Sequence, residues 1–150
     1  MTAESENGAD APVISVAIRH RHTHEVLYRV TGRTLRGADL SSLALYKADL
    51  EGADLSGANL SGTSLLGADL HGARLDEANL HRATLYAADL SGASLEGADL
   101  RSTDLRGAVL EGARLHGALF AGARYGRYAL AGRLQSSQLR RVRRRAPAEG

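Results

Sequence analysis

The sequence predicts a solenoid, a rod of short repeats that stack on one another, and three observations support this prediction. A large apolar residue occupies every fifth position from Leu35 to Leu130, beginning with seventeen consecutive leucines of that series. The residue two places before the apolar residue is alanine in fifteen of the repeats. The residue two places after it is most often glycine, as at Gly52 and Gly57. Units this short must stack, because none can bury its own apolar face.

The spacing of five excludes a straight helix and a straight strand. A helix turns by roughly 100° per residue, so steps of five would spread the leucines around every side. In a strand, residues five apart point alternately to opposite faces. A chain that turns a corner every five residues instead directs each leucine to a common axis. The narrow interior then takes one large and one small inward residue on each side, which are leucine and alanine.

The remaining repeat positions suit the corners. Glycine favours tight turns because it lacks a Cβ atom. Aspartate or asparagine often stands directly before the leucine, as at Asp49, Asn59 and Asp69. These short polar side chains tolerate turn geometry and can hydrogen-bond the nearby backbone.

The run ADLEGADLSGANLSG from Ala48 to Gly62 carries the motif A-(D/N)-L-x-x. In this motif the chain resembles the pentapeptide repeat family, and the resemblance extends over residues 31–131. It implies an all-β fold, a right-handed quadrilateral β-helix with four repeats per coil. Twenty repeats would then make about five coils. At a strand spacing of ~4.8 Å, such a rod would be about 24 Å long.

The composition is that of one domain of 150 residues. The absence of cysteine excludes disulfides and cysteine-based zinc sites. The polar opening MTAESENGADAP does not match a signal peptide, and no apolar run reaches the roughly 20 residues that span a bilayer. We therefore expect a cytoplasmic location, no membrane span and no cofactor.

The amino-terminal segment departs from the repeat. We expect residues 1–12 to be a disordered leader and residues 13–30 to form a β-hairpin. Val16 and Ile18, then Val26 and Tyr28, alternate with other residues around the polar middle HRHTH. The first coil of a solenoid exposes an open strand edge, and this hairpin is placed to cap it.

At the other end, residues 132–150 form a basic segment with weak helical spacing, and its last residues are expected to be disordered. The preceding residues are unusually apolar. The candidate cap or dimer patch comprises Leu119, Phe120, Tyr125, Tyr128, Leu130 and Leu134. A short helix of the same chain could cover it. A two-fold homodimer could instead stack end on end, as some gyrase-targeting relatives do by resemblance, and we favour the dimer.

Coils of twenty residues align positions twenty apart into columns. One face gathers five acids without a base from the repeats, and these are Asp49, Asp69, Asp89, Glu51 and Glu111. By resemblance, family members that protect DNA gyrase mimic DNA. This face supports a topoisomerase partner, although duplex DNA carries one charge per ~1.7 Å. The alternative is that aspartate here is an ordinary turn residue.

A second column is apolar and faces outward. It consists of Tyr46, Leu66 and Tyr86. Exposed apolar patches mark partner sites. The alternative is that these side chains shield one another along the ladder, which also stabilises sheets.

Two further clusters are candidate ligand sites. A group of five arginines suits phosphate, acidic lipid or an acidic protein, or is a solvated tail, and comprises Arg140, Arg141, Arg143, Arg144 and Arg145. Any nucleic-acid contact would be made through this segment. His20, His22 and His24 would share one face of a strand and could bind a metal, unless His24 lies in a turn. We assign no metal site.

No catalytic constellation is present in the sequence. His71, His81 and His116, and serines such as Ser56, fall in outward slots on a filled rod, where no concave pocket is expected. The sequence therefore predicts a non-enzymatic interaction or scaffold protein that presents laddered faces to a macromolecular partner. The alternative is a DNA-mimicking protein that binds DNA gyrase or another topoisomerase.

Overall fold

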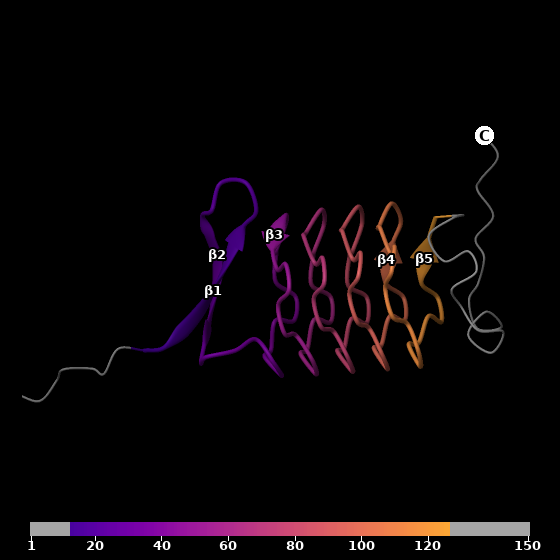
Figure 1. Ribbon diagram of the computed structural model, residues 1–150, viewed down its shortest axis with the longest axis horizontal. Coiled ribbons are helices and arrows are strands. Elements are labelled where there is room, and N and C mark those ends of the chain that lie inside the picture. The colour runs from indigo at the N-terminus through magenta and orange to yellow at the C-terminus, as the bar shows by residue number, and fades with distance from the viewer. Residues whose placement is uncertain (1–12, 127–150) are drawn as a thin grey trace, which may run out of the picture.

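The computed structural model describes residues 13–126, which form a rod of stacked coils with a hairpin at one end (Figure 1). The five strands are β1 (Ser15–His20), β2 (Val26–Thr31), β3 (Ala48–Asp49), β4 (Asp104–Leu105) and β5 (Arg124–Tyr125). Most of the remaining ladder consists of isolated bridges between single residues. The secondary structure of residues 13–126 is strands, bridges and turns.

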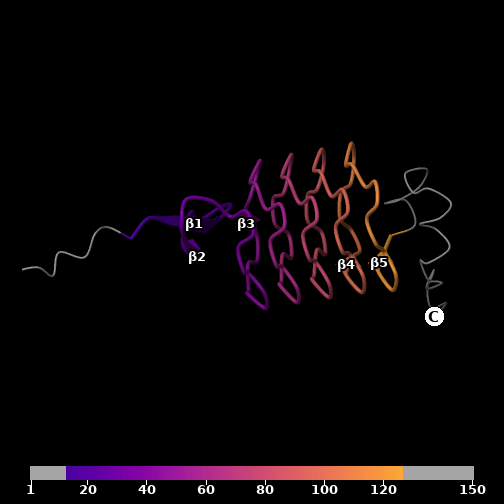
Figure 2. The same ribbon diagram turned by 90° about the horizontal axis from the view of Figure 1, so that it is seen from below.

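The coils pair in parallel with a register of twenty residues. Asp39 bridges Asn59, Asn59 bridges Asn79, and Asn79 bridges Asp99. The Leu60 N–H donates to the carbonyl of Asn79 at 2.7 Å, and the Asn79 N–H donates to the carbonyl of Ala58 at 2.9 Å. One turn of the chain therefore takes four five-residue repeats, and the view from below shows the coils stacked along the long axis (Figure 2).

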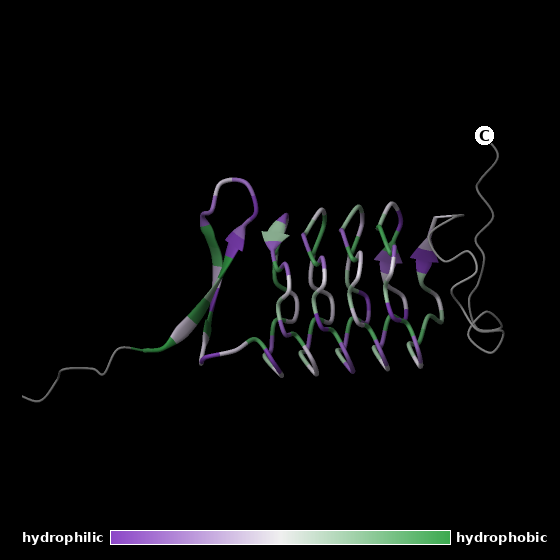
Figure 3. Ribbon diagram, viewed as in Figure 1, coloured by the Kyte–Doolittle hydropathy of each residue, from purple (hydrophilic) through white to green (hydrophobic). Residues whose placement is uncertain are grey.

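The core is the column of inward leucines and alanines. Leu75, Leu80 and Ala78 are 0% exposed. Thr63 and Thr103 replace inward alanines and are also buried, because their hydroxyls donate to the carbonyls of Leu40 and Leu80 at 2.6 and 2.8 Å. Apolar and polar segments alternate along each coil as the chain passes between the interior and the surface (Figure 3).

The corners are tight turns, and within residues 13–126 all but the one at residues 40–43 are closed by a backbone hydrogen bond. At a representative corner, the Ala58 N–H donates to the carbonyl of Leu55 at 3.0 Å, and Gly57 has φ of 66°. A positive φ at the third residue of a turn is the requirement of a type II turn, which explains the glycines. At six corners another residue adopts φ between 50° and 59°, and these are Ser42, Lys47, Glu77, Arg82, Ala87 and Ser102.

The hairpin is tied to the first coil. β1 lies between its antiparallel neighbours β2 and β3, with Arg19 opposite Asp49 and His20 opposite Ala48. The Arg21 N–H also donates to the carbonyl of Lys47 at 2.8 Å. Ile18 is 1% exposed and joins the core of the rod. The hairpin therefore covers both an open strand edge and part of the apolar end of the coil stack.

Within residues 13–126, no helix is long and apolar enough to cross a membrane.

Candidate interaction surfaces along the rod

On each face of a coil, one outward residue lies between the inward alanine and the inward leucine. Where this outward residue is aspartate or asparagine, its side chain caps the next corner. The side-chain oxygen accepts a hydrogen bond from the backbone N–H two residues later, at 2.9 to 3.5 Å. The N–H groups bound in this way belong to Ser41, Glu51, Ser56, Ser61, His71, His81, Ser91, Arg101 and Arg106. The aspartates of the motif are therefore turn caps as well as surface charges.

These hydrogen bonds favour the ionised carboxylates. The Ser91 hydroxyl and then the Ser91 backbone N–H hold the pKa of Asp89 below its usual value. For Asp104, the hydrogen bond from the Arg106 side chain is the main cause of a lowered pKa. The guanidinium of Arg106 lies 2.9 and 2.6 Å from the two carboxylate oxygens, and its own pKa is raised by the same pairing. Asp99 and Arg101 repeat this arrangement.

Asp49, Asp69 and Asp89 form the aspartate column, since parallel bridges join each to the next. The hairpin supplies a base to it: the Arg21 guanidinium lies 3.4 Å from the Asp69 carboxylate. The sequence expectation of a face without bases concerned the repeats only and missed this residue. The signal was present, because Arg21 lies in the polar middle of the predicted hairpin and Arg19 directly precedes it.

The other two acids of that face lie in the neighbouring column. Glu51 and Glu111 are exposed, with His71 and Ser91 at the intervening levels. A His71 ring nitrogen lies 2.9 Å from the Ser91 hydroxyl, which in turn donates to Asp89 at 2.5 Å. The face is therefore a hydrogen-bonded polar surface with scattered charges.

Tyr46, Leu66 and Tyr86 form a second column, here called the tyrosine stripe, at one corner of the rod. Their exposed fractions are 52%, 39% and 45%. The Arg106 guanidinium continues the column and lies 5.7 Å from the centre of the Tyr86 ring. Arg21 reaches the same corner, where it donates to the carbonyl of Gly67 at 3.3 Å.

The three amino-terminal histidines do not share a strand face. β1 ends at His20, a turn follows at residues 21–23, and His24 has φ of 60°. The His20 Nδ1 accepts hydrogen bonds from the N–H groups of His22 and Thr23 at 3.3 and 3.1 Å, which stabilises the turn. No group of three potential metal ligands comes together in the described part of the chain.

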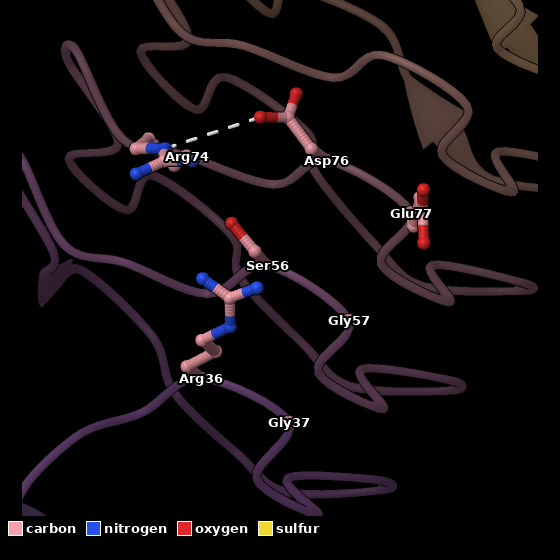
Figure 4. Close-up of a pocket in the computed structure, with 7 residues that line it drawn as sticks. All are labelled: Arg36, Gly37, Ser56, Gly57, Arg74, Asp76 and Glu77. Carbon is pink, nitrogen blue, oxygen red and sulfur yellow. Dashed lines mark ion pairs between the residues drawn. The ribbon is translucent and has the colours of Figure 1, made fainter.

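A shallow hollow of about 430 Å³ opens on another face (Figure 4). It is lined by Arg36, Gly37, Ser56, Gly57, Arg74, Asp76 and Glu77. Its cations face neighbouring acids: Arg74 lies 3.9 Å from Asp76, and Arg36 lies 3.9 Å from Asp54. The Ser56 hydroxyl donates to Asp54 at 2.6 Å. The sequence analysis predicted no concave pocket on the rod. The hollow forms because small corner residues lie between longer side chains of adjacent coils, an arrangement that appears only when the coils are stacked.

The candidate cap or dimer patch divides between interior and surface. Phe120 is 3% exposed and continues the core, Leu119 is 43% exposed on a side face, and Tyr125 is partly buried against the core. Tyr128, Leu130 and Leu134 lie outside the described residues, as do all five arginines of the candidate anion-binding tail.

Comparison with known proteins gives one consistent result. The model of the family "Pentapeptide repeats" matches residues 31–57, 53–92 and 83–122, in eight copies. No curated protein matches the sequence.

Solved structures also match. A pentapeptide repeat protein of the Arabidopsis thaliana thylakoid lumen is 34% identical, with 60% of this chain and 63% of that chain covered and a TM-score of 0.59. One from Nostoc is 33% identical, with 62% and 78% covered and a TM-score of 0.49. QnrB1, a plasmid-mediated fluoroquinolone resistance protein, is 26% identical, with 57% and 46% covered and a TM-score of 0.29.

Proposed function

Because the chain belongs to the pentapeptide repeat family, we propose that it is a non-enzymatic scaffold that binds a macromolecular partner through one surface of its β-helix. The family relationship supports a right-handed β-helix filled by its own side chains. Such a rod offers flat, laddered faces for recognition, and both arginines of the shallow hollow already lie beside carboxylates.

The observation that carries this proposal is the exposure of the tyrosine stripe. Mutual shielding is a weak explanation for it, because Tyr46 and Tyr86 are separated by two strand spacings, ~9.6 Å, and only Leu66 lies between them. All three side chains keep more than a third of their surface in contact with water. A continuous exposed apolar column is the feature expected where a partner binds.

The test replaces the stripe and measures capture of the partner. The variant carries Tyr46→Ser, Leu66→Ser and Tyr86→Ser, and its control carries Val109→Ser and Leu119→Ser, two exposed apolar residues on other faces. Each immobilised protein is incubated with lysate of the native cell, and bound proteins are quantified by mass spectrometry. We expect wild type and control to retain one common protein that the stripe variant loses. Equal capture by all three would refute the proposal.

The aspartate column supports a second candidate, a DNA mimic directed at gyrase or another topoisomerase. Its three carboxylates are aligned along the rod, although Arg21 reduces the charge at Asp69. A mimic should inhibit gyrase, or protect it from inhibitors, in a supercoiling assay. The effect should weaken with salt, which screens exposed charges, and with Asp49→Asn, Asp69→Asn and Asp89→Asn together. Supercoiling that is unchanged at low salt would exclude this candidate.

A further inference from the structure

Three successive levels of the corner that carries the tyrosine stripe lack the aspartate or asparagine cap that is present at nine other corners of residues 13–126. The backbone N–H groups of Tyr46, Leu66 and Tyr86 make no hydrogen bond within residues 13–126. The outward residues two positions earlier are Ala44, which carries no acceptor, and Ser64 and Thr84, whose hydroxyls do not accept from these N–H groups as Thr34 does from Arg36. One level further along the same corner, Asp104 caps Arg106. Three successive coils therefore present a row of N–H donors about one strand spacing, ~4.8 Å, apart.

Side chains also gather at the corners that border this face. Of the six corner residues with positive φ that are not glycine, five lie at the two corners that flank the strip Ala44, Ser64 and Thr84. These five are Ser42, Lys47, Arg82, Ala87 and Ser102. Glycine serves the other corners at lower conformational cost, so the folding of the coils does not require these side chains.

Three cations lie near the donors, and two of them are paired with carboxylates, Arg21 with Asp69 and Arg106 with Asp104. Lys47 follows Tyr46 directly and has no ion pair within residues 13–126. Arg21 reaches the backbone beside Leu66, and Arg106 lies over the ring of Tyr86. Backbone donors, cations and apolar side chains therefore alternate along one corner. This combination is complementary to a surface that carries carboxylates between apolar side chains.

We propose that the occupant of this corner is an acidic amphipathic helix of the partner protein. This inference rests on the proposed function and specifies its partner. Glutamates or aspartates of the helix accept hydrogen bonds from the three N–H groups, as the chain's own aspartates do at other corners. Apolar residues on the same helix face pack on the tyrosine stripe.

The spacing of the donors favours a helix over a strand. A helix that lies along the rod presents side chains at i, i+4 and i+7 about 5.4 Å apart, close to the ~4.8 Å repeat of the coils. Side chains on one face of a strand repeat at about 6.8 Å and lose register within two steps. A nucleic-acid strand is disfavoured, because its charges, about one per 3.4 Å, are more closely spaced than the donors, which repeat at about 4.8 Å.

The test uses backbone amide NMR of the full-length ¹⁵N-labelled protein. The probe is a synthetic 18-residue helical peptide, with glutamate at i, i+4 and i+7 and leucine beside them. The matched peptide carries glutamine in place of glutamate. We expect the amide protons of Tyr46, Leu66 and Tyr86 to move downfield with the glutamate peptide and less with the glutamine peptide. The capped amides of Ser61 and His71 serve as internal controls.

A variant that restores the caps provides the decisive comparison. Ala44→Asn, Ser64→Asn and Thr84→Asn together should occupy the three N–H groups from within the chain. We expect an unchanged or raised melting temperature and peptide binding that is weaker by at least about tenfold, since each hydrogen bond to a charged group contributes more than one such step. The single variant Asp89→Asn, on the adjacent face, should bind as wild type does.

Three results would overturn the inference: equal binding by the capped variant, equal binding of the two peptides, or amide shifts produced by a thymidine oligonucleotide in place of the peptide. Partner capture separates this inference from the proposed function. If the cellular partner is lost with the serine-substituted stripe but kept with the asparagine caps, the scaffold function stands and the helix inference fails. If the serine variant loses nothing, the proposed function fails.

Discussion

At the scale of single residues, the identity of the corner residue with positive φ determines the conformational strain of the turn. Glycine occupies this position at most corners, but Ala87 occupies it with φ of 54°. A Cβ atom placed on Gly92 would lie 4.0 Å from its nearest backbone neighbour, so space does not require the glycine there. The left-handed backbone conformation, with φ of 67°, is what favours glycine at this position.

We therefore expect Gly92→Ala to lower the free energy of unfolding by about 1 kcal/mol, the usual cost of a side chain at positive φ. Ala87→Gly should have a smaller effect of opposite sign, because relief of the same strain is partly offset by a more flexible unfolded chain. Urea denaturation of both variants measures these changes. A stabilising Gly92→Ala would show that the corner does not hold the turn type described here.

The capping aspartates predict the behaviour of the rod in acid. Hydrogen bonds lower the pKa of Asp89, Asp99 and Asp104 in the folded state. Their contribution to stability is complete above the unfolded pKa, about 3.9, and is lost as pH falls through the lower folded values. The melting temperature should therefore decrease steeply below about pH 4. Asp89→Asn, Asp99→Asn and Asp104→Asn together should reduce that slope, as followed by circular dichroism. The same slope in both proteins would mean that the caps do not contribute.

At the scale of the coil, stability depends on leucines that contact the coils above and below. Leu75 is 0% exposed in the middle of the rod. Leu75→Ala should lower the free energy of unfolding by about 2–5 kcal/mol, through lost transfer energy and an unfilled cavity. Leu66→Ala is the matched control, since Leu66 is 39% exposed and its loss should change stability by less than about 0.5 kcal/mol. Similar melting temperatures for the two variants would contradict the inward register.

Much of this architecture is predictable from the sequence because each repeat places the same residue types at the same positions. The period of five predicts the inward leucines, and alanine predicts the narrow core. Glycine predicts the corners. The sequence predicts that the hairpin caps the first coil, but the pairing of Arg19 with Asp49 was not predictable, because Arg19 lies in a segment that follows no repeat. The uncapped corner was also not predicted. The structure was needed to show that an outward side chain accepts from the N–H two residues later, and only then does the lack of such a bond at Ala44, Ser64 and Thr84 become evident.

At the scale of the whole molecule, the coil that contains β5 requires a cover, because its open strand edge would otherwise face water. We propose that a second copy of the chain covers it, as part of a two-fold dimer. Light scattering should give twice the chain mass for the full-length protein and the monomer mass after truncation following Ala131. A monomeric full-length protein, together with a truncation that is soluble and equally stable, would exclude both a dimer and an intramolecular cap.

The central claim is that one corner of the rod binds a protein partner, and site-specific photo-crosslinking tests it most directly. A photoreactive benzoylphenylalanine is introduced in place of Tyr86 and, in a second protein, in place of His116, an exposed corner residue on another face. Both proteins are expressed in the native cell and irradiated. The account predicts one discrete crosslinked protein from position 86 and none from position 116. The same products from both positions, or none from position 86, would contradict it.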